Sequence, residues 1–96
     1  MVGYQEGSIV SRIIHQEEVG TLTVFAFDEG QALSEHTVPF NAYIQVLEGE
    51  ALITIGEKSC VVREGEIVLM PGAVPHRVNA EKRFKMLLTM VKAPAR

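Results

Sequence analysis

The sequence has a single cysteine, no tryptophan and few aromatic residues, and each scarcity removes a class of protein. Cys60 is the only cysteine among 96 residues, and 6% of the residues are aromatic. A single thiol cannot form an internal disulfide or a cysteine-rich metal cluster. Nine lysines and arginines stand against twelve acidic residues, a net charge of −3. The chain therefore lacks the basic surface with which nucleic-acid-binding proteins neutralise phosphates.

Long hydrophobic runs are also missing. No apolar run approaches the ~20 residues that span a bilayer, and no basic stretch followed by an apolar one begins the chain. We therefore expect a cytoplasmic protein with no membrane or nucleic-acid partner. The hydrophobic fraction of 47% and the charged fraction of 22% are typical of a globular protein. A chain of this length can build one core, so we expect residues 1–96 to form a single domain.

What the sequence does contain is hydrophobic alternation with a period of two. The residues of these segments are rich in β-branched and aromatic types, which favours strands. No stretch carries a three-turn helical stripe, so the alternation predicts an all-β protein. The clearest segments are residues 21–27, 43–48, 51–55 and 84–91, with a short apolar run at 67–70 and a further candidate at 9–14.

Polar triplets that contain glycine separate these segments. They recur every eight to ten residues, a spacing typical of an antiparallel sandwich or barrel, here of six to eight strands. Glycine supplies the positive backbone angles that tight turns require. We therefore predict tight hairpins at residues 48–50 and 56–58.

Two segments, residues 30–49 and 65–80, share a pattern of glycine, histidine and proline spacing. The first starts with glycine, places His36 after five further residues and ends with glycine; the second starts with glycine and then places Pro71 and His76. Together they resemble the paired motifs of the cupin superfamily. The resemblance implies a cupin-type double-stranded β-helix, a jelly-roll barrel, in which the two segments surround one metal or ligand site.

The resemblance nominates His36 and His76 as the site residues, and it also shows which ligands have been replaced. In the first motif, Val38 and Ala42 occupy the places of a second histidine and of a glutamate. In the second motif, a glycine and an asparagine each stand one place early. The spacing of the family pattern is kept, while half of its ligand chemistry is gone.

This loss bears on the cofactor. A catalytic site for Fe, Mn, Ni or Zn uses three or four imidazole and carboxylate ligands. His36 and His76 supply two neutral nitrogens, so a dication between them would keep uncompensated charge in apolar surroundings. Asn41 and Gln45 offer weaker neutral oxygens, and a bound anionic substrate could complete the shell.

Three functions remain open at this point, and whether the protein is an enzyme stays undecided. The protein could bind a small molecule without metal, with His36 and His76 as acid–base or hydrogen-bonding groups. It could be a metal-dependent oxygenase or isomerase that acts on a small acid or sugar. It could instead be a non-catalytic sensing or accessory module. In each case we expect the pocket wall to include Val38, Ala42, Ile44, Met70 and Met86.

Two further expectations concern the surface and the core. A chain this short gains core by association, so we expect a homodimer formed through apolar outer sheet faces. These faces would carry Phe25, Phe27, Tyr43 and Leu47. Cys60 alternates with its neighbours, which predicts a buried structural thiol.

Overall fold

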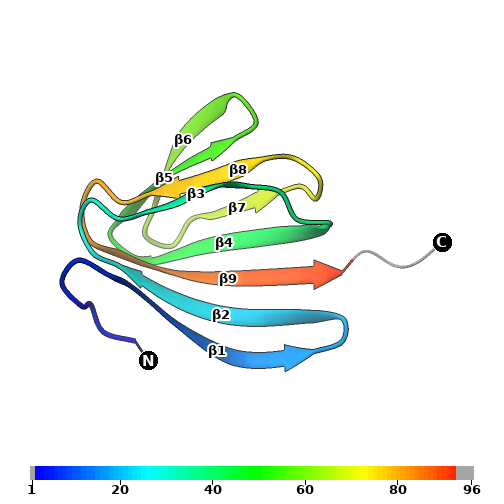
Figure 1. Cartoon of the computed structure of the whole chain (residues 1–96), viewed down its shortest axis with the longest axis horizontal. Coiled ribbons are helices and arrows are strands. Elements are labelled where there is room, and N and C mark those ends of the chain that lie inside the picture. Colours follow the sequence, from blue (N-terminus) through cyan, green and yellow to red (C-terminus); the bar gives the residue numbers. More distant parts are fainter. Residues whose placement is uncertain (1, 93–96) are drawn as a thin grey trace.

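The computed structural model describes residues 2–92 as nine strands in two antiparallel sheets, with no helix in this range (Figure 1). One sheet has the order β1-β2-β9-β4-β7 and the other β3-β8-β5-β6. Residues 2–92 thus contain no helix long and apolar enough to cross a membrane. The strands are β1 (Ile9–Glu17), β2 (Gly20–Phe27), β3 (Ala32–His36), β4 (Phe40–Glu48), β5 (Glu50–Ile55), β6 (Lys58–Arg63), β7 (Ile67–Met70), β8 (His76–Asn79) and β9 (Phe84–Lys92).

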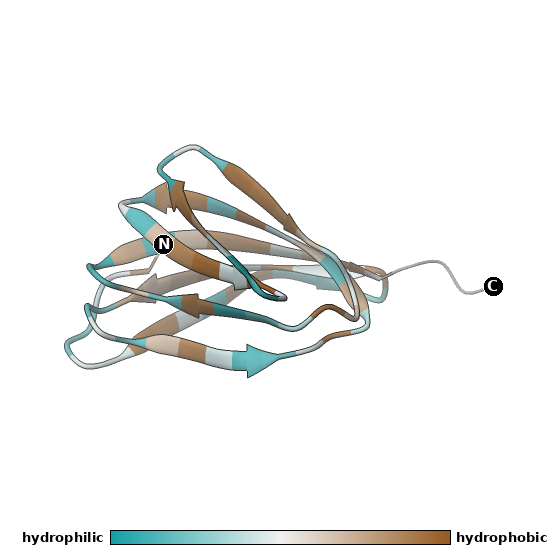
Figure 2. Cartoon of the chain, turned by 90° about the horizontal axis from the view of Figure 1, so that it is seen from above, coloured by the Kyte–Doolittle hydropathy of each residue, from teal (hydrophilic) through white to brown (hydrophobic). Residues whose placement is uncertain are grey.

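The two sheets enclose a single core, and the all-β jelly-roll prediction is confirmed. Apolar bands alternate along the strands in both layers, while the turns are mostly polar (Figure 2). Successive side chains of a strand point to opposite faces, so each alternating segment contributes every second residue to the interior. The largest fully buried side chains are Phe27, Phe84, Ile44, Ile53, Met86, Val24, Val46 and Val78.

The strand count exceeds the expected six to eight because three strands carry little hydrophobic alternation. β3 is almost wholly exposed, β6 buries only Val62, and β8 has four residues. Pairing with neighbouring strands, rather than their own composition, holds these short segments in the sheet. The candidate strand at 9–14 is confirmed as part of β1, which pairs with β2.

One predicted hairpin is confirmed and the other is wrong. β5 and β6 pair directly, with Ile55 opposite Lys58. At residues 48–50, by contrast, β4 belongs to the five-stranded sheet and β5 to the four-stranded sheet, so Gly49 is a crossing between layers. Gly49 has φ 79°, and a Cβ there would lie 2.7 Å from the carbonyl oxygen of Arg83. Glycine is required at position 49 because the Arg83 carbonyl oxygen lies so close, and not because the chain forms a hairpin there.

The predicted outward faces of Phe25 and Phe27 are also wrong. Phe25 pairs with Met86 and Phe27 with Phe84, and antiparallel partners share one face of the sheet. Phe27 is fully buried and its ring stacks on that of Phe84, with centroids 4.5 Å apart. The alternation of residues 21–27 is apolar on both faces, so the sequence pattern could not decide which face points inward.

The prediction of a buried thiol at Cys60 is wrong as well, since this residue is exposed. Cys60 lies opposite Ile53, on the inner side of its sheet. However, β6 is the last strand of that sheet, so no further strand beside it covers the side chain. Alternation along a strand predicts the face of a residue but not whether the strand lies at an edge.

The loops gather at two ends of the sandwich, which lie to the left and right in Figure 1. The tied end comprises residues 2–8, 28–31, 49, 64–66 and 80–83. The histidine end comprises residues 18–19, 37–39, 56–57 and 71–75. His36 closes β3 and His76 opens β8, so both side chains lie at the histidine end.

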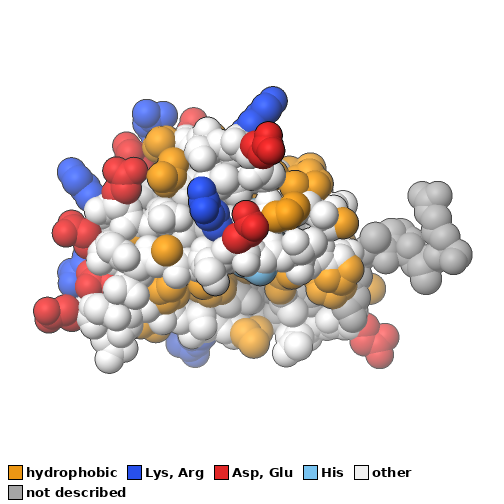
Figure 3. All heavy atoms as spheres, turned by 45° about the horizontal axis from the view of Figure 1, so that its top comes forward, with side chains coloured by type: hydrophobic (Ala, Val, Ile, Leu, Met, Phe, Trp, Pro, Cys, Tyr) orange, Lys and Arg blue, Asp and Glu red, His pale blue; other side chains and the backbone are white. Residues whose placement is uncertain are grey.

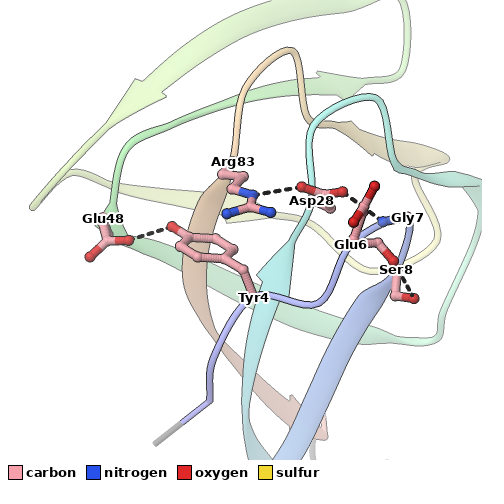
Figure 4. Close-up of polar contacts among 7 residues, drawn as sticks. All are labelled: Tyr4, Glu6, Gly7, Ser8, Asp28, Glu48 and Arg83. Atoms are coloured by element: carbon pink, nitrogen blue, oxygen red, sulfur yellow. Dashed lines mark hydrogen bonds and ion pairs between the residues drawn. The ribbon is translucent and has the colours of Figure 1, made fainter.

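Polar contacts hold the N-terminal segment to the tied end (Figure 4). Arg83 Nε donates to Asp28 Oδ1 at 2.6 Å, and the backbone N–H of Gly7 donates to Asp28 Oδ2 at 2.6 Å. The Tyr4 hydroxyl hydrogen-bonds to Glu48, and the Arg83 guanidinium lies 5.2 Å from the centroid of the Tyr4 ring. Donation from Arg83 first, and then from Gly7, lowers the pKa of Asp28 to about 2.

Candidate functional site

The structure places His36 and His76 side by side. They are directly opposed partners across the antiparallel pair β3 and β8, on the inner face of the four-stranded sheet. Their ring centroids lie 4.3 Å apart with an interplanar angle of 66°, an edge-to-face contact. Two histidines that are 40 positions apart in the sequence thus form one local pair.

A cavity adjoins the histidine pair and extends between the sheets. Its empty space is about 320 Å³ and partly open to solvent. In the view of Figure 3, a histidine side chain reaches the surface next to apolar side chains. The cavity is lined by Leu33, His36, Val38, Ala42, Ile44, Met70, His76, Val78, Met86, Leu88 and Met90.

All five residues expected in the pocket wall line this cavity, together with four further apolar residues. Leu88 and Met90 follow Met86 at every second position of β9, so strand parity alone could have found them. Val78 lies two residues after His76 in β8, so strand parity could have found it as well. Leu33 comes from β3, whose exposed, polar sequence carries no such signal.

The hydrogen bonds of the two rings define their tautomers. His36 Nδ1 lies 2.8 Å from the carbonyl oxygen of Ser34, and His76 Nδ1 lies 3.4 Å from that of Val74. A carbonyl oxygen only accepts, so each Nδ1 carries the proton and each Nε2 keeps its lone pair. The pair therefore offers two Nε2 acceptors to a bound group.

The two histidines differ in burial. His36 is exposed, while His76 is only 5% exposed. Burial, and then the neighbouring His36, lower the pKa of His76. His76 is therefore a neutral imidazole at neutral pH, with a solvent-facing partner beside it.

The loop of residues 71–75 positions His76. The Ala73 N–H donates to the carbonyl oxygen of Val38 at 2.8 Å, which joins the two loops of the histidine end. Gly72 N–H donates to Asn41 Oδ1 at 3.0 Å, so this amide oxygen serves the loop. Ala73 has φ 67°, a left-handed conformation that favours glycine. The family pattern places glycine at this position, where this chain has an alanine with a positive φ.

The donors of this site fit a divalent metal poorly. Among residues 2–92, no three histidine, cysteine, aspartate or glutamate side chains come together in a group that could hold a metal. Val38 and Ala42, which replace the remaining family ligands, line the cavity with apolar groups. Asn41 and Gln45 pair with Val91 and Leu87, on the outer face of their sheet, so they add no oxygen to the site. Two neutral nitrogens leave most of a dication's charge uncompensated.

A larger depression, with about 760 Å³ of empty space, lies at the tied end beside Gly49 and Leu52. Its charged rim is a mixture of both signs, and Arg83 there is already paired with Asp28. It contains no histidine and brings no convergent set of polar groups together. The cavity at the histidine end is therefore the stronger candidate site.

Comparisons with known proteins agree with this architecture. A model described as a cupin domain matches residues 23–92. A conserved protein of unknown function from Streptococcus pyogenes is 36% identical, with 95% of this chain and 80% of that chain covered and a TM-score of 0.89. A cupin 2 conserved barrel domain protein from Leptotrichia buccalis is 39% identical, covering 95% of this chain but 44% of that one, with a TM-score of 0.92. Curated proteins gave no match.

Proposed function

The chain belongs to the cupin domain family, and we propose that it binds one small, mostly apolar molecule beside His36 and His76. The observation that carries this proposal is the pair itself: two histidine rings in contact line a cavity whose other lining side chains are all apolar. Such a pocket matches a ligand with one hydrogen-donating group and an apolar body.

The apolar lining argues against a sugar as the ligand. Every sugar hydroxyl that is buried without a partner costs free energy, and the cavity offers polar groups only at the histidine pair. A small alcohol, a phenol or a protonated acid places a single donor there. Met70, Met86 and Met90 are flexible side chains, so their rotation can enlarge the cavity for such a ligand.

Six-membered rings that differ in hydroxyl number test this proposal. Thermal unfolding would be followed with cyclohexanol, phenol and glucose, and binding would then be measured by titration calorimetry. We expect cyclohexanol or phenol to raise the unfolding temperature, by about 4–8 °C per kcal/mol of binding stabilisation, and glucose to leave it unchanged.

Two variants provide the controls for that experiment. His76→Leu keeps the buried volume but removes the acceptor, and His36→Ala removes the exposed partner with little effect on the core. We expect both to fold and both to weaken the binding of the alcohols. Equal binding by the wild type and the two variants, or tighter binding of glucose than of cyclohexanol, would contradict the proposal.

The expected homodimer is proposed on a revised surface. Phe25 and Phe27 point into the core, but Tyr43 is 40% exposed and Ile67 is 62% exposed on the outer face of the five-stranded sheet. Leu69 and Val91 extend this face, and the outer positions of β7, of β4 from 41 to 45 and of β9 from 87 to 91 carry no charged side chain. An uncharged apolar face suits a second copy of itself, because a two-fold axis brings identical patches together.

Sedimentation velocity over a range of concentrations tests this assembly. We expect a dimer for the wild type and a folded monomer for Leu69→Lys, since this side chain is half exposed and contributes little to the core. A wild type that stays monomeric at every concentration would contradict the proposed dimer.

A further inference from the structure

The cavity at the histidine end gathers sulfur as well as nitrogen. Met70, Met86 and Met90 are all the methionines among residues 2–92, and all three line the same cavity as His36 and His76. Thioether and imidazole groups are both neutral, and thioethers are soft donors. The site has lost ligands of the family pattern, and the donors that remain are all neutral nitrogen and sulfur groups.

Two of the three methionines lie in one row across the sheet. Ala42 of β4 is directly opposed by Met70 of β7 on one side and by Met90 of β9 on the other. Adjacent strands lie about 4.8 Å apart, and directly opposed residues share one face. The single methyl group of Ala42 thus separates two thioether side chains, at the position where the family pattern has a carboxylate.

Met86 belongs to a different row. It is opposed by Val46 and Phe25, and it stands four residues from Met90 along β9, about 13 Å of strand. It lines the same cavity but lies closer to the tied end. Met86 therefore provides a matched control, with the same chemistry in the same cavity but outside the row of Ala42.

Charge decides which ion these donors can hold. The cost of transferring an ion into a medium of low dielectric rises with the square of its charge, so a monovalent ion costs about a quarter as much as a dication of equal size. A monovalent ion bound by neutral nitrogen and sulfur ligands therefore needs a balancing carboxylate less than a dication does. Soft thioether ligands suit Cu(I), imidazole suits copper as well as zinc and iron, and Mn(II) favours carboxylate and other oxygen ligands.

We propose that His36 and His76, with Met70 and Met90 across the cavity, form a binding site for a monovalent soft cation, Cu(I). Both Nε2 lone pairs are available because each Nδ1–H donates to a backbone carbonyl. This site goes beyond the organic-ligand pocket proposed above, since it uses the thioethers as donors rather than as an apolar wall.

The test is an anaerobic Cu(I) titration against the chromogenic chelator bicinchoninate. All proteins would carry Cys60→Ser, because an exposed thiol would itself bind Cu(I). We expect one Cu(I) per chain for this background, and at least about tenfold weaker binding for Met70→Leu and for Met90→Leu. Met86→Leu should stay within about twofold of the background. Circular dichroism would establish that each variant is folded, and X-ray absorption would show sulfur as well as nitrogen around the copper.

The outcomes separate this site from the proposed function. Loss of Cu(I) to the chelator by the background protein, or equal affinity in Met70→Leu, Met90→Leu and Met86→Leu, would overturn the copper site. Tighter binding of Zn(II) than of Cu(I) would overturn it as well. Alcohol binding would be measured separately on chelator-treated protein, so its presence or absence is independent of the result with copper.

Discussion

The two ends of the sandwich have the same strands but contrasting chemistry. At the tied end, the rings of Phe27 and Phe84 stack, and Arg83 and Asp28 hold the N-terminal segment. At the histidine end, the cavity opens between the sheets, and Ala73 occupies a left-handed conformation. Ring stacking and an ion pair stabilise the tied end, while backbone strain and the cavity beside the histidine pair lie at the other, a distribution often associated with functional sites.

The largest expected effect tests whether stability resides at the tied end. Phe84→Ala removes a fully buried ring that stacks on Phe27, so we expect a loss of about 3–5 kcal/mol in the free energy of unfolding, measured with urea. Val38→Ala at the histidine end removes a half-buried side chain and should cost about 1 kcal/mol. Equal losses for the two variants would remove the contrast between the ends.

A second test concerns the crossing between the sheets. Gly49→Ala combines a positive φ with a Cβ 2.7 Å from the Arg83 carbonyl oxygen, so we expect a loss of about 2–4 kcal/mol. Gly30→Ala also has a positive φ, 81°, but its Cβ would meet nothing within 4 Å, and we expect about 1–2 kcal/mol. Thermal unfolding of both proteins measures the difference, and a Gly30→Ala loss as large as that of Gly49→Ala would show that the close approach is unimportant.

The third test uses pH to weaken the tied end alone. The pKa of Asp28 falls from 3.8 to about 2 on folding, so the folded state binds this proton less readily than the unfolded state. The stabilisation is therefore complete above the unfolded pKa and is lost as the pH falls from about 4 towards 2. Urea unfolding between pH 2 and 6 should show a smaller acid destabilisation for Asp28→Asn than for the wild type. Glu57→Gln, in the turn between β5 and β6, should retain the full wild-type effect, and an Asp28→Asn profile parallel to the wild type would contradict the assignment.

The smallest effect has the opposite sign and belongs to the histidine end. Ala73→Gly relieves a left-handed alanine but adds backbone entropy to the unfolded chain, so we expect a net stabilisation of about 0.5–1 kcal/mol. The hydrogen bond from the backbone N–H of residue 73 to Val38 needs no side chain and should persist. Differential scanning calorimetry measures the shift, and a destabilised Ala73→Gly protein would show that the alanine conformation carries no strain.

The sequence by itself determined the fold class and seven of the residues that line the cavity. Period-two alternation indicates strands, because side chains of a strand alternate between faces. The resemblance of the two glycine–histidine segments to the cupin motifs led to the prediction that His36 and His76 share one site. Met70 and Met86, which were expected in the pocket wall, do line the cavity. These are local properties of the chain, and the family match over residues 23–92 agrees with them.

Only the tertiary structure decided which faces and edges are covered. Phe25 and Phe27 lie in a segment that is apolar on both sides, so the packing of the second sheet determined that they point inward. Cys60 is exposed because β6 is an edge strand, and Gly49 joins two sheets because β4 and β5 pair with different neighbours. The alignment of Met70, Ala42 and Met90 likewise depends on strand order. Pairings between distant segments depend on the whole arrangement of strands, which no local pattern contains.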